Sequence, residues 1–573
     1  MVNVDDSDFD QSGAHHDTAQ TLGPGNAREE RGGSERGGSK PSRLDDLNFD
    51  NRFTAQLRAD PIDVNSRRQV MGAAFSRVRP TPVASPTTAI WSAEVADLLG
   101  LSVEVCESAD FSAVFAGNRV PEGADPFAMC YGGHQFGNWA GQLGDGRAIA
   151  LGEVTDVSGG HQTLQLKGPG PTPYSRGADG RAVLRSSIRE FLCSEAMFHL
   201  GVPTTRALSL VVTGDSVVRD MLYDGNPAPE PGAIVCRVAP SFVRFGNFQL
   251  PAARGDIDLL QQLVRYTIQR DFAHLLGQSG EVDQDAIVRF FQEVCERSVS
   301  LVVHWMRVGF VHGVLNTDNM SILGLTIDYG PYGWLENFDP GWTPNTTDAG
   351  GKRYRYGAQP QVFHWNLVQL ANALVPLLDD PAPLQQTVDR FSDMYADQFR
   401  TMMATRLGWG NHRGLADDHL TQALWAVLVS TEIDQVIFFR RLAQVSLAPD
   451  ATDEGLLRPL EAAWYQPEEI TAEVRERLVG WLRSWADRVR SEKTSDAARI
   501  ATMNRSNPKY VLRNYLAQQV IDAATGGDYG PLHEMLEVLR RPYDEQPGRE
   551  QLFAKRPEWA RHRVGCSMLS CSS

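Results

Sequence analysis

The sequence has no uninterrupted apolar run approaching the roughly 20 residues that a helix needs to span a bilayer. It also lacks an excess of basic residues, because 55 Lys and Arg stand against 71 Asp and Glu and the formal net charge is −16. Attraction to nucleic acids or anionic membranes comes from clustered Lys and Arg, so neither partner is expected, although a local basic pocket for a nucleotide is compatible with this charge. The acidic start of the chain, without an apolar core, fits neither a secretory signal nor an Arg-rich transit peptide. We therefore expect a cytoplasmic location.

Cysteine is sparse as well, with seven residues scattered along the chain. Most of them lie in apolar stretches and are predicted to be reduced core residues: Cys106, Cys130, Cys193, Cys236 and Cys295. The C-terminal pair, Cys566 and Cys571, is expected to be exposed. This pair could react with a redox partner, although a frayed and inert tail explains it equally well.

Composition divides the chain into four parts. Residues 1–45 are rich in Gly, Ser and charged residues, so they cannot bury enough apolar surface to offset the entropy of ordering, and a disordered acidic tail is expected. Residues 46–250 mix strand-like runs with Gly-rich turns, and residues 251–560 are mainly helical in pattern. Residues 561–573 are expected to form a flexible tail that carries the last two cysteines.

Hydrophobic periodicity predicts the elements that frame the motifs described next. Strands are expected at 148–152, 163–167, 207–212 and 233–238. Helices are expected at 181–200, 257–276, 284–308 and 363–377. The order favours a strand-rich part followed by a larger helical part.

A glycine-rich turn, GQLGDGR at 141–147, directly precedes a predicted strand. Glycines such as Gly144 and Gly146 let backbone amides approach phosphate oxygens closely, and Arg147 adds a fixed positive charge. The alternative is an ordinary glycine-rich hairpin turn.

A lysine and a glutamate follow the glycine turn in the order found in protein kinases. Lys167 ends a predicted strand and Glu190 lies in the next helix, as do the kinase lysine that binds phosphates and the glutamate that orients it. Glu195 is a possible substitute on the same helix. Alone, a lysine at a strand end is usually only solvated.

The segment from His312 to Asn319 keeps the His-to-Asn spacing of a kinase catalytic loop, and Asp328-Tyr-Gly follows it. Asn319 and Asp328 are therefore candidate ligands of Mg²⁺ or Mn²⁺, since amide and carboxylate oxygens suit hard cations. An Asx-rich turn after a core helix is the alternative. Val314 stands where a kinase has its catalytic aspartate, so either the fold is inactive or Asp318 is a relocated base.

Two further stretches add positive charge near these motifs. One runs from Asp179 and Gly180 into the helix that carries Glu190, and the other contributes Arg237 and Arg244. The planar guanidinium group of arginine can donate two hydrogen bonds to a phosphate, so these residues are candidate phosphate ligands. The alternative is that they form ion pairs on the protein surface.

The motifs at 131–147, 164–176 and 312–331 resemble those of the selenoprotein O (SelO, YdiU) family of protein adenylyltransferase pseudokinases, and the resemblance runs from about residue 47 to the C-terminus. It implies an α+β, protein-kinase-like bilobal fold, with a strand-rich N-lobe, a larger helical C-lobe and family-specific extensions. It further implies that ATP binds in a flipped orientation and that AMP is transferred to Ser, Thr or Tyr hydroxyl groups of proteins, with release of pyrophosphate.

The resemblance also implies roles for single residues. Those expected along the nucleotide are Gly144, Gly146, Arg147, Lys167, Asp179, Gly180, Arg237, Arg244 and Asp328. Asp318 is the expected proton acceptor, Asn319 and Asp328 are the expected metal ligands, and Glu190 is expected to orient Lys167.

The chain departs from some relatives, which pair a C-terminal cysteine with one after the Asp-Tyr-Gly motif, because residues 331–348 contain no cysteine. Two other functions stay open at this point: transfer of the γ-phosphate, as in a kinase, and a catalytically inactive nucleotide-binding scaffold.

Overall fold

A seven-stranded antiparallel sheet forms the first half of the protein in this computed structural model, which describes residues 43–221 and 223–570. Its strand order is β1-β3-β6-β7-β9-β8-β2. The strands are β1 (Phe75–Arg77), β2 (Thr87–Trp91), β3 (Phe127–Met129), β6 (Ala148–Thr155), β7 (His161–Lys167), β8 (Arg206–Arg219) and β9 (Ala228–Ala239). The four predicted strands are confirmed as β6 to β9, each longer than predicted. A separate hairpin, β4 (Gly132–Gln135) and β5 (Asn138–Gln142), lies outside this sheet.

Both faces of the sheet are buried, and the alternation of side chains along each strand explains how. On β9, Ile234 and Cys236 belong to a core shared with the small helices α2 (Ala93–Leu98), α3 (Val103–Cys106) and α4 (Ala109–Phe115). The intervening Val235 belongs instead to the main core under helix α5 (Leu184–His199). Helix α5 lies within the range 181–200 at which a helix was predicted.

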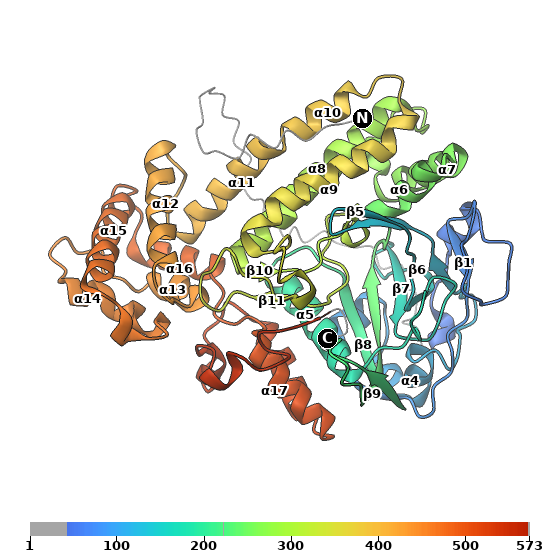
Figure 1. The fold of residues 1–573 in the computed structure, drawn as a ribbon, viewed down its shortest axis with the longest axis horizontal. Coiled ribbons are helices and arrows are strands. Elements are labelled where there is room, and N and C mark those ends of the chain that lie inside the picture. The colour runs from blue at the N-terminus through green and yellow to red at the C-terminus, as the bar shows by residue number, and fades with distance from the viewer. Residues whose placement is uncertain (1–42, 222, 571–573) are drawn as a thin grey trace, which may run out of the picture.

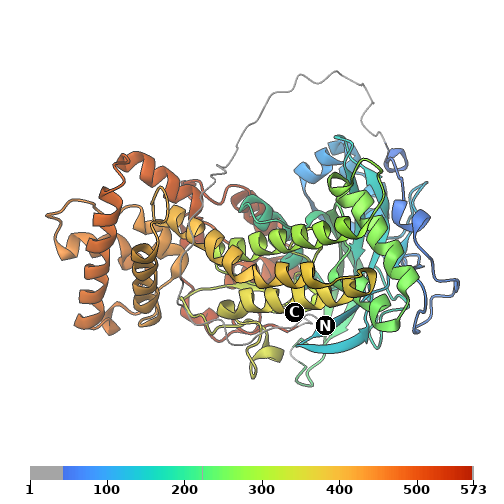
Figure 2. The same ribbon diagram turned by 90° about the horizontal axis from the view of Figure 1, so that it is seen from above.

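Helices make up most of the second half, as predicted. Helix α8 (Gln284–Val308) has the bounds that periodicity predicts, because the Asp283 side chain accepts a hydrogen bond from the Ala286 amide and Gly309, at φ 74°, ends the helix. The others are α6 (Phe245–Arg254), α7 (Ile257–Asp271), α9 (Gln359–Leu374), α10 (Ala382–Asp389), α11 (Phe391–Arg406), α12 (Leu415–Val429), α13 (Gln435–Leu442), α14 (Asp453–Leu457), α15 (Ala472–Arg490), α16 (Asp496–Ser506), α17 (Asn514–Thr525) and α18 (Gly530–Leu539). Helices α8 to α11 run beside one another next to the sheet, and α12 to α16 form the far end of the molecule (Figures 1 and 2).

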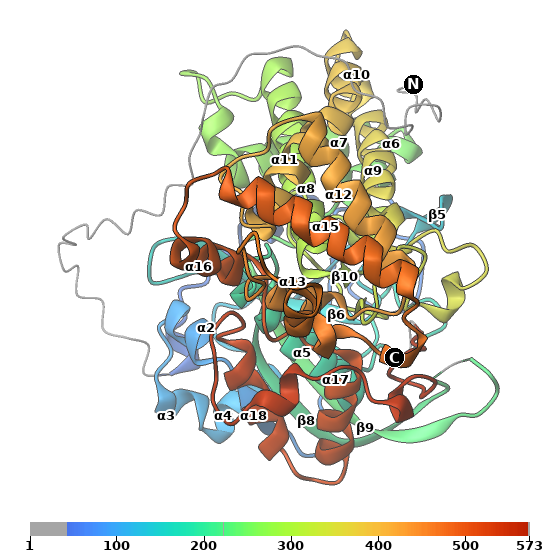
Figure 3. The same cartoon turned by 90° about the vertical axis from the view of Figure 1, so that its left-hand side faces the viewer.

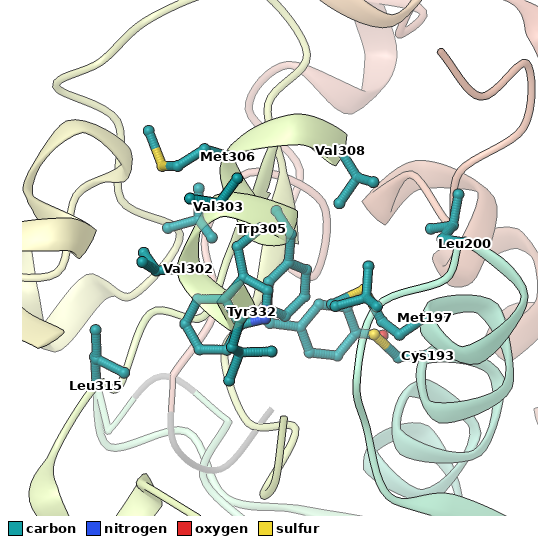
Figure 4. Close-up of a cluster of buried hydrophobic side chains, with 14 of the residues drawn as sticks. Cys193, Met197, Leu200, Val302, Val303, Trp305, Met306, Val308, Leu315 and Tyr332 are labelled. Atoms are coloured by element: carbon teal, nitrogen blue, oxygen red, sulfur yellow. The ribbon is translucent and has the colours of Figure 1, made fainter. Parts of the chain in front are cut away.

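One hydrophobic core joins the sheet-bearing half to the helical half. Cys193 and Met197 of α5 face Trp305 of α8 and Tyr332 across this junction (Figure 4). The Trp305 ring stacks on the imidazole of His312, with ring centroids 5.3 Å apart. Because this contact reaches the start of the predicted catalytic loop, the loop is held on the same core as the helix that carries Glu190.

The end of the described chain is packed rather than exposed. The Leu569 amide donates to the Pro344 carbonyl (3.1 Å), and Leu569 is fully buried. Helix α17, which precedes this segment, packs on α5 (Figure 3). The prediction that Cys566 is exposed is wrong: it is 5% exposed, its carbonyl accepts a hydrogen bond from Asn514 (2.8 Å), and burial raises the pKa of its thiol to about 11. A protonated, covered thiol is a poor nucleophile, so a redox role for Cys566 has no support.

The remaining predictions about the ends of the chain and about the cysteines are confirmed only in part. Cys571 and most of the predicted N-terminal tail lie outside the described residues, although Leu44 is described and is buried. The five remaining cysteines are buried and unpaired, as predicted. Among helices within 43–221 and 223–570, none combines the length and the hydropathy of a bilayer-spanning segment.

Candidate active site

Lys167 and Glu190 form a buried ion pair, as their order along the chain predicts. The Lys167 ammonium lies 2.6 Å from a Glu190 carboxylate oxygen and 3.4 Å from Asp328 Oδ1. Burial lowers the pKa of Lys167, although Glu190 and Asp328 oppose that shift. Glu195 does not share this contact, because its carboxylate accepts hydrogen bonds from Arg206 (2.7 and 2.8 Å). The structure thus selects Glu190 as the partner of Lys167.

Asp328 is the centre at which the predicted cations converge. Its Oδ1 lies 2.5 Å from Arg237 Nη1, and its Oδ2 lies 2.7 Å from Arg244 Nη1. Burial opposes ionisation, but Arg237, Lys167 and Arg244 hold the pKa of Asp328 well below its usual value. The backbone of Asp328 is left-handed (φ 58°), a strained conformation that often marks functional positions.

Asp318 is buried beside this cluster with one carboxylate oxygen free. Its Oδ2 accepts a hydrogen bond of 3.3 Å from Gln135, whereas Oδ1 has no hydrogen-bond partner among the described residues. Burial raises the pKa of Asp318 to about 6, despite the opposing charge of Arg244. Gly133 leaves the space for this side chain, since a Cβ there would lie 2.7 Å from Oδ1. Asp318 is therefore a poised and incompletely hydrogen-bonded carboxylate.

The backbone around Val314 orients Asn319. The Asn319 amide nitrogen donates to the Val314 carbonyl (2.8 Å), which directs the amide oxygen elsewhere. His312 Nε2 bonds the carbonyl of Ile327 (3.0 Å), the residue before Asp328. The two halves of the motif are thereby tied together, although they were recognised separately in the sequence.

The glycine turn has a packing reason as well as a possible phosphate role. Gly144 is left-handed (φ 74°), and a Cβ there would lie 2.4 Å from the Tyr174 ring, while a Cβ on Gly146 would lie 2.9 Å from the Tyr174 carbonyl. Arg147, at the end of the turn, lines a small cavity of about 10 Å³ together with Lys167 and Glu190. Of the residues in this turn, Arg147 is thus brought next to the Lys167–Glu190 pair.

Asp179 and Gly180 lie on the loop between β7 and α5. The Asp179 carboxylate is held by Arg219, at the end of β8, through two hydrogen bonds of 2.8 Å. Despite burial, Arg219 lowers the pKa of Asp179. Gly180 is left-handed (φ 71°) and approaches Gly170 so closely that a Cβ would lie 2.1 Å from its carbonyl oxygen. The contacts of this loop are with β8 and its own turn rather than with Asp328.

Comparison with known proteins identifies the family of this chain. Residues 62–540 match the family model described as protein adenylyltransferase SelO. The chain belongs to this family. Relatives called protein nucleotidyltransferase YdiU include those of Rhodopirellula baltica (58% identical over 537 residues), Azoarcus sp. strain BH72 (60% over 529) and Xanthomonas campestris pv. campestris strain B100 (60% over 527). Each match covers 92% of this chain and 99% of the relative. The family and the enzyme class predicted from the motifs, a protein adenylyltransferase, are confirmed.

The SelO-family motifs supply few metal ligands of their own. No group of three or more His, Cys, Asp or Glu side chains in the described part of the chain is arranged to hold a metal ion. Asn319 and Asp328 offer hard oxygen atoms of the kind that Mg²⁺ prefers, so phosphate and water oxygens would have to complete its shell. Three cationic side chains already surround Asp328, and they would repel a metal ion unless a polyanion were bound. The donor set therefore fits Mg²⁺ as a partner of the triphosphate.

Three residues of the cluster were missed in the sequence. Gln165 accepts a hydrogen bond from Arg237, and Gln135 donates to Asp318. Asp145 of the glycine turn, buried at 3% exposure, lies 3.7 Å from Arg244. Only Asp145 had a signal that could have identified it, since it stands between the two glycines of the turn.

Proposed function

We propose that this protein transfers the AMP moiety of ATP to Ser, Thr or Tyr hydroxyl groups of proteins. The fold is a kinase-like bilobal fold, and ATP binds to it in the reverse of the orientation found in kinases. The two lobes correspond to residues 46–250 and 251–560. One observation carries the proposal: the buried carboxylate of Asp318 adjoins the cations around Asp328. Its Oδ1 has no hydrogen-bond partner among the described residues. Val314 occupies the position at which a kinase has its base. Arg244 links the two aspartates, donating to the Asp318 carbonyl (2.9 Å) and to Asp328.

The chemistry follows from the placement of these groups. The acceptor hydroxyl oxygen forms a bond to the α-phosphorus, the bond from that phosphorus to the bridging oxygen breaks, and pyrophosphate leaves with the electron pair. Asp318 accepts the hydroxyl proton. Lys167, Arg237 and Arg244 bind the phosphates and offset the charge that develops on them. Mg²⁺ or Mn²⁺, when held by Asn319 and Asp328, would neutralise further phosphate charge.

Two observations disfavour the alternatives. Val314 cannot accept a proton, which counts against γ-phosphoryl transfer with ordinary kinase geometry. A passive scaffold would have no need of a buried Lys167–Glu190 pair or of a carboxylate whose pKa is raised toward neutrality.

The position of the isotope in the product tests the proposal. The protein is incubated with Mg²⁺, an acceptor protein and ATP labelled separately at the α- and γ-phosphates. We expect the α-label on protein and the γ-label in pyrophosphate. Retention of the γ-label on protein would indicate a kinase, and retention of neither label would indicate a scaffold.

The rate is expected to depend on pH through Asp318. A general base must be deprotonated to act, and burial raises the pKa of Asp318 to about 6. We therefore expect kcat/KM to rise about tenfold per pH unit below this value and to level off above it. Steady-state assays between pH 5 and pH 8, with metal and ATP saturating at each pH, measure the profile. A flat profile across this range would remove Asp318 as the base.

A further inference from the structure

The β4–β5 hairpin is fastened directly to the segment that carries Asp318. The His134 amide donates to Thr317 Oγ1 (2.7 Å), and the Phe136 amide donates to the Tyr354 hydroxyl (2.8 Å). Gln135, between them, donates to Asp318 itself. The position of the hairpin is thus set relative to the base, and its tip cannot shift without disturbing these bonds.

The tip of this hairpin presents aromatic side chains to solvent. Phe136 is 36% exposed and Trp139 is 40% exposed. Phe136 also has a left-handed backbone (φ 52°), which is costly for a bulky residue and persists only where neighbouring contacts enforce it. Each ring rests on a partner beneath it, Phe136 on Tyr354 (centroids 5.2 Å apart) and Trp139 on His134 (5.0 Å). Rigid, half-exposed aromatic residues of this kind are enriched where proteins bind partners.

A basic segment borders the aromatic tip. Residues 352–355 contain Lys352, Arg353 and Arg355, in a protein whose formal net charge is −16. The Arg353 guanidinium lies over the Trp365 ring, 4.8 Å from its centroid, and a Cβ on Gly137 at the tip would lie 3.4 Å from Arg353 Cζ. The surface next to Asp318 therefore combines apolar rings with local positive charge.

The hairpin and the phosphate-binding Arg244 contact different parts of Asp318. Arg244 approaches the Asp318 backbone from the side of Asp328, whereas Gln135 approaches the carboxylate from the hairpin. A general base must lie within hydrogen-bond reach of the acceptor hydroxyl, whose oxygen in turn must lie next to the phosphorus that it attacks. Because Lys167, Arg237 and Arg244 all contact Asp328, whereas the hairpin contacts the Asp318 carboxylate and has an exposed tip, the hairpin offers the acceptor a surface beside the base.

We infer that Phe136, Trp139 and Arg353 form the docking surface for the acceptor protein, and this inference rests on the proposed function. The occupant is an extended segment with an aromatic or large aliphatic residue next to the hydroxyl residue and an acidic residue beyond it. The apolar side chain packs on Phe136 and Trp139, and the carboxylate pairs with Arg353. The hydrogen bonds that the hairpin backbone donates to Thr317 and Tyr354 fix the position of this surface relative to Asp318.

Three synthetic peptides test the inference. The first carries Ser flanked by Phe and Glu, the second replaces Glu with Lys, and the third replaces Phe with Ala. Transfer from α-labelled ATP is measured in the full-length protein. We expect the first peptide to have a kcat/KM at least about tenfold above either of the others, in line with the energy of one interface contact. Arg353→Glu should reverse the preference between the first two, and Trp139→Ala should raise KM for the first peptide about tenfold while leaving KM for ATP unchanged.

Matched substitutions elsewhere serve as controls. Trp559, also half-exposed (45%), is replaced by alanine, and the exposed Lys493 is replaced by glutamate. Neither change should alter peptide preference, and thermal unfolding should show all variants folded.

Each remaining outcome has a distinct meaning. Equal rates for the three peptides, an unchanged preference in Arg353→Glu, or labelling of proteins but of none of the peptides would overturn the docking surface alone. A rise in KM for ATP instead of peptide would assign the tip to the nucleotide and overturn it too. Absence of α-label from every protein and peptide would overturn the proposed function, and the docking inference with it.

Discussion

Replacing Asp328 with alanine is expected to abolish AMP transfer, with kcat/KM falling by roughly 10³-fold or more, or at least about 4 kcal/mol of transition-state stabilisation. The substitution removes a proposed metal ligand and also the carboxylate that holds two arginines, at 2.5 and 2.7 Å, in position for the phosphates. Transfer of label from α-labelled ATP to protein, measured at saturating Mg²⁺ and ATP, gives the result. Near-normal turnover in a folded Asp328→Ala variant would refute both roles.

Stability has to be measured alongside activity for this variant. Removing the carboxylate leaves Lys167 and Arg237 with Glu190, and Arg244 with Asp145, as their nearest counter-charges, and an uncompensated buried charge costs on the order of 3 kcal/mol. We therefore expect Asp328→Ala to lower Tm. Asp328→Asn keeps the shape but not the charge, so it is expected to lose transfer in the same way. Asp453→Ala, at an exposed acidic residue paired with Arg483, is the matched control and should change neither quantity.

Replacing Asp318 with asparagine is expected to lower kcat about 10²- to 10⁴-fold, the range that general base catalysis contributes. The dissociation constant for ATP should change little, because no phosphate contact is assigned to this side chain. Calorimetric titration with ATP and Mg²⁺ separates binding from turnover. Normal turnover would remove Asp318 as the proton acceptor, whereas loss of ATP binding would place it among the nucleotide ligands.

The same substitution is expected to stabilise the protein at neutral pH. The pKa of Asp318 is about 6 in the folded protein against 3.8 as its ordinary value, so the folded state binds more protons between these two pH values. Stability from this group is fully present below pH 3.8 and falls as pH rises through about 6, by about 3 kcal/mol at most. Asp318→Asn, which is neutral throughout, should therefore have a higher Tm than the unsubstituted protein at pH 8 but not at pH 4. A lower Tm at pH 8 would mean that the charged carboxylate is stabilised in a way that the contacts do not explain.

Much of the site could be predicted because its parts are local in the chain. Lys167 ends a strand that directly precedes the helix of Glu190, so their meeting follows from strand-to-helix order alone. Asn319 and Asp328 were predicted as metal ligands from their spacing within one short stretch, and that assignment stays a prediction. The bounds of α8 were predicted from apolar periodicity, and the structure shows a capping aspartate and a terminal glycine at those bounds.

The contacts that were not predicted join segments far apart in the chain. Arg237 reaches Asp328 across 91 residues, and Gln135 reaches Asp318 across 183. Arginine forks were expected near phosphates, but nothing in the local pattern indicated that they would share one carboxylate. The burial of Cys566 was missed for a similar reason, since the terminal segment has few apolar residues and is covered by contacts with Asn514 and, through Leu569, with Pro344.

The amino-acid sequence by itself determined the family and the order of the main strands and helices, and it offered Lys167, Glu190 or Glu195, and the proposed ligands Asn319 and Asp328 as candidates, because each lies within one turn or one strand–helix step. Only the tertiary structure decided that three cations gather on Asp328, that Asp318 is buried with a pKa near neutrality, and that an aromatic hairpin faces it. Those features depend on which distant segments a single core brings together, and the free energy of burial, not local spacing, selects that arrangement.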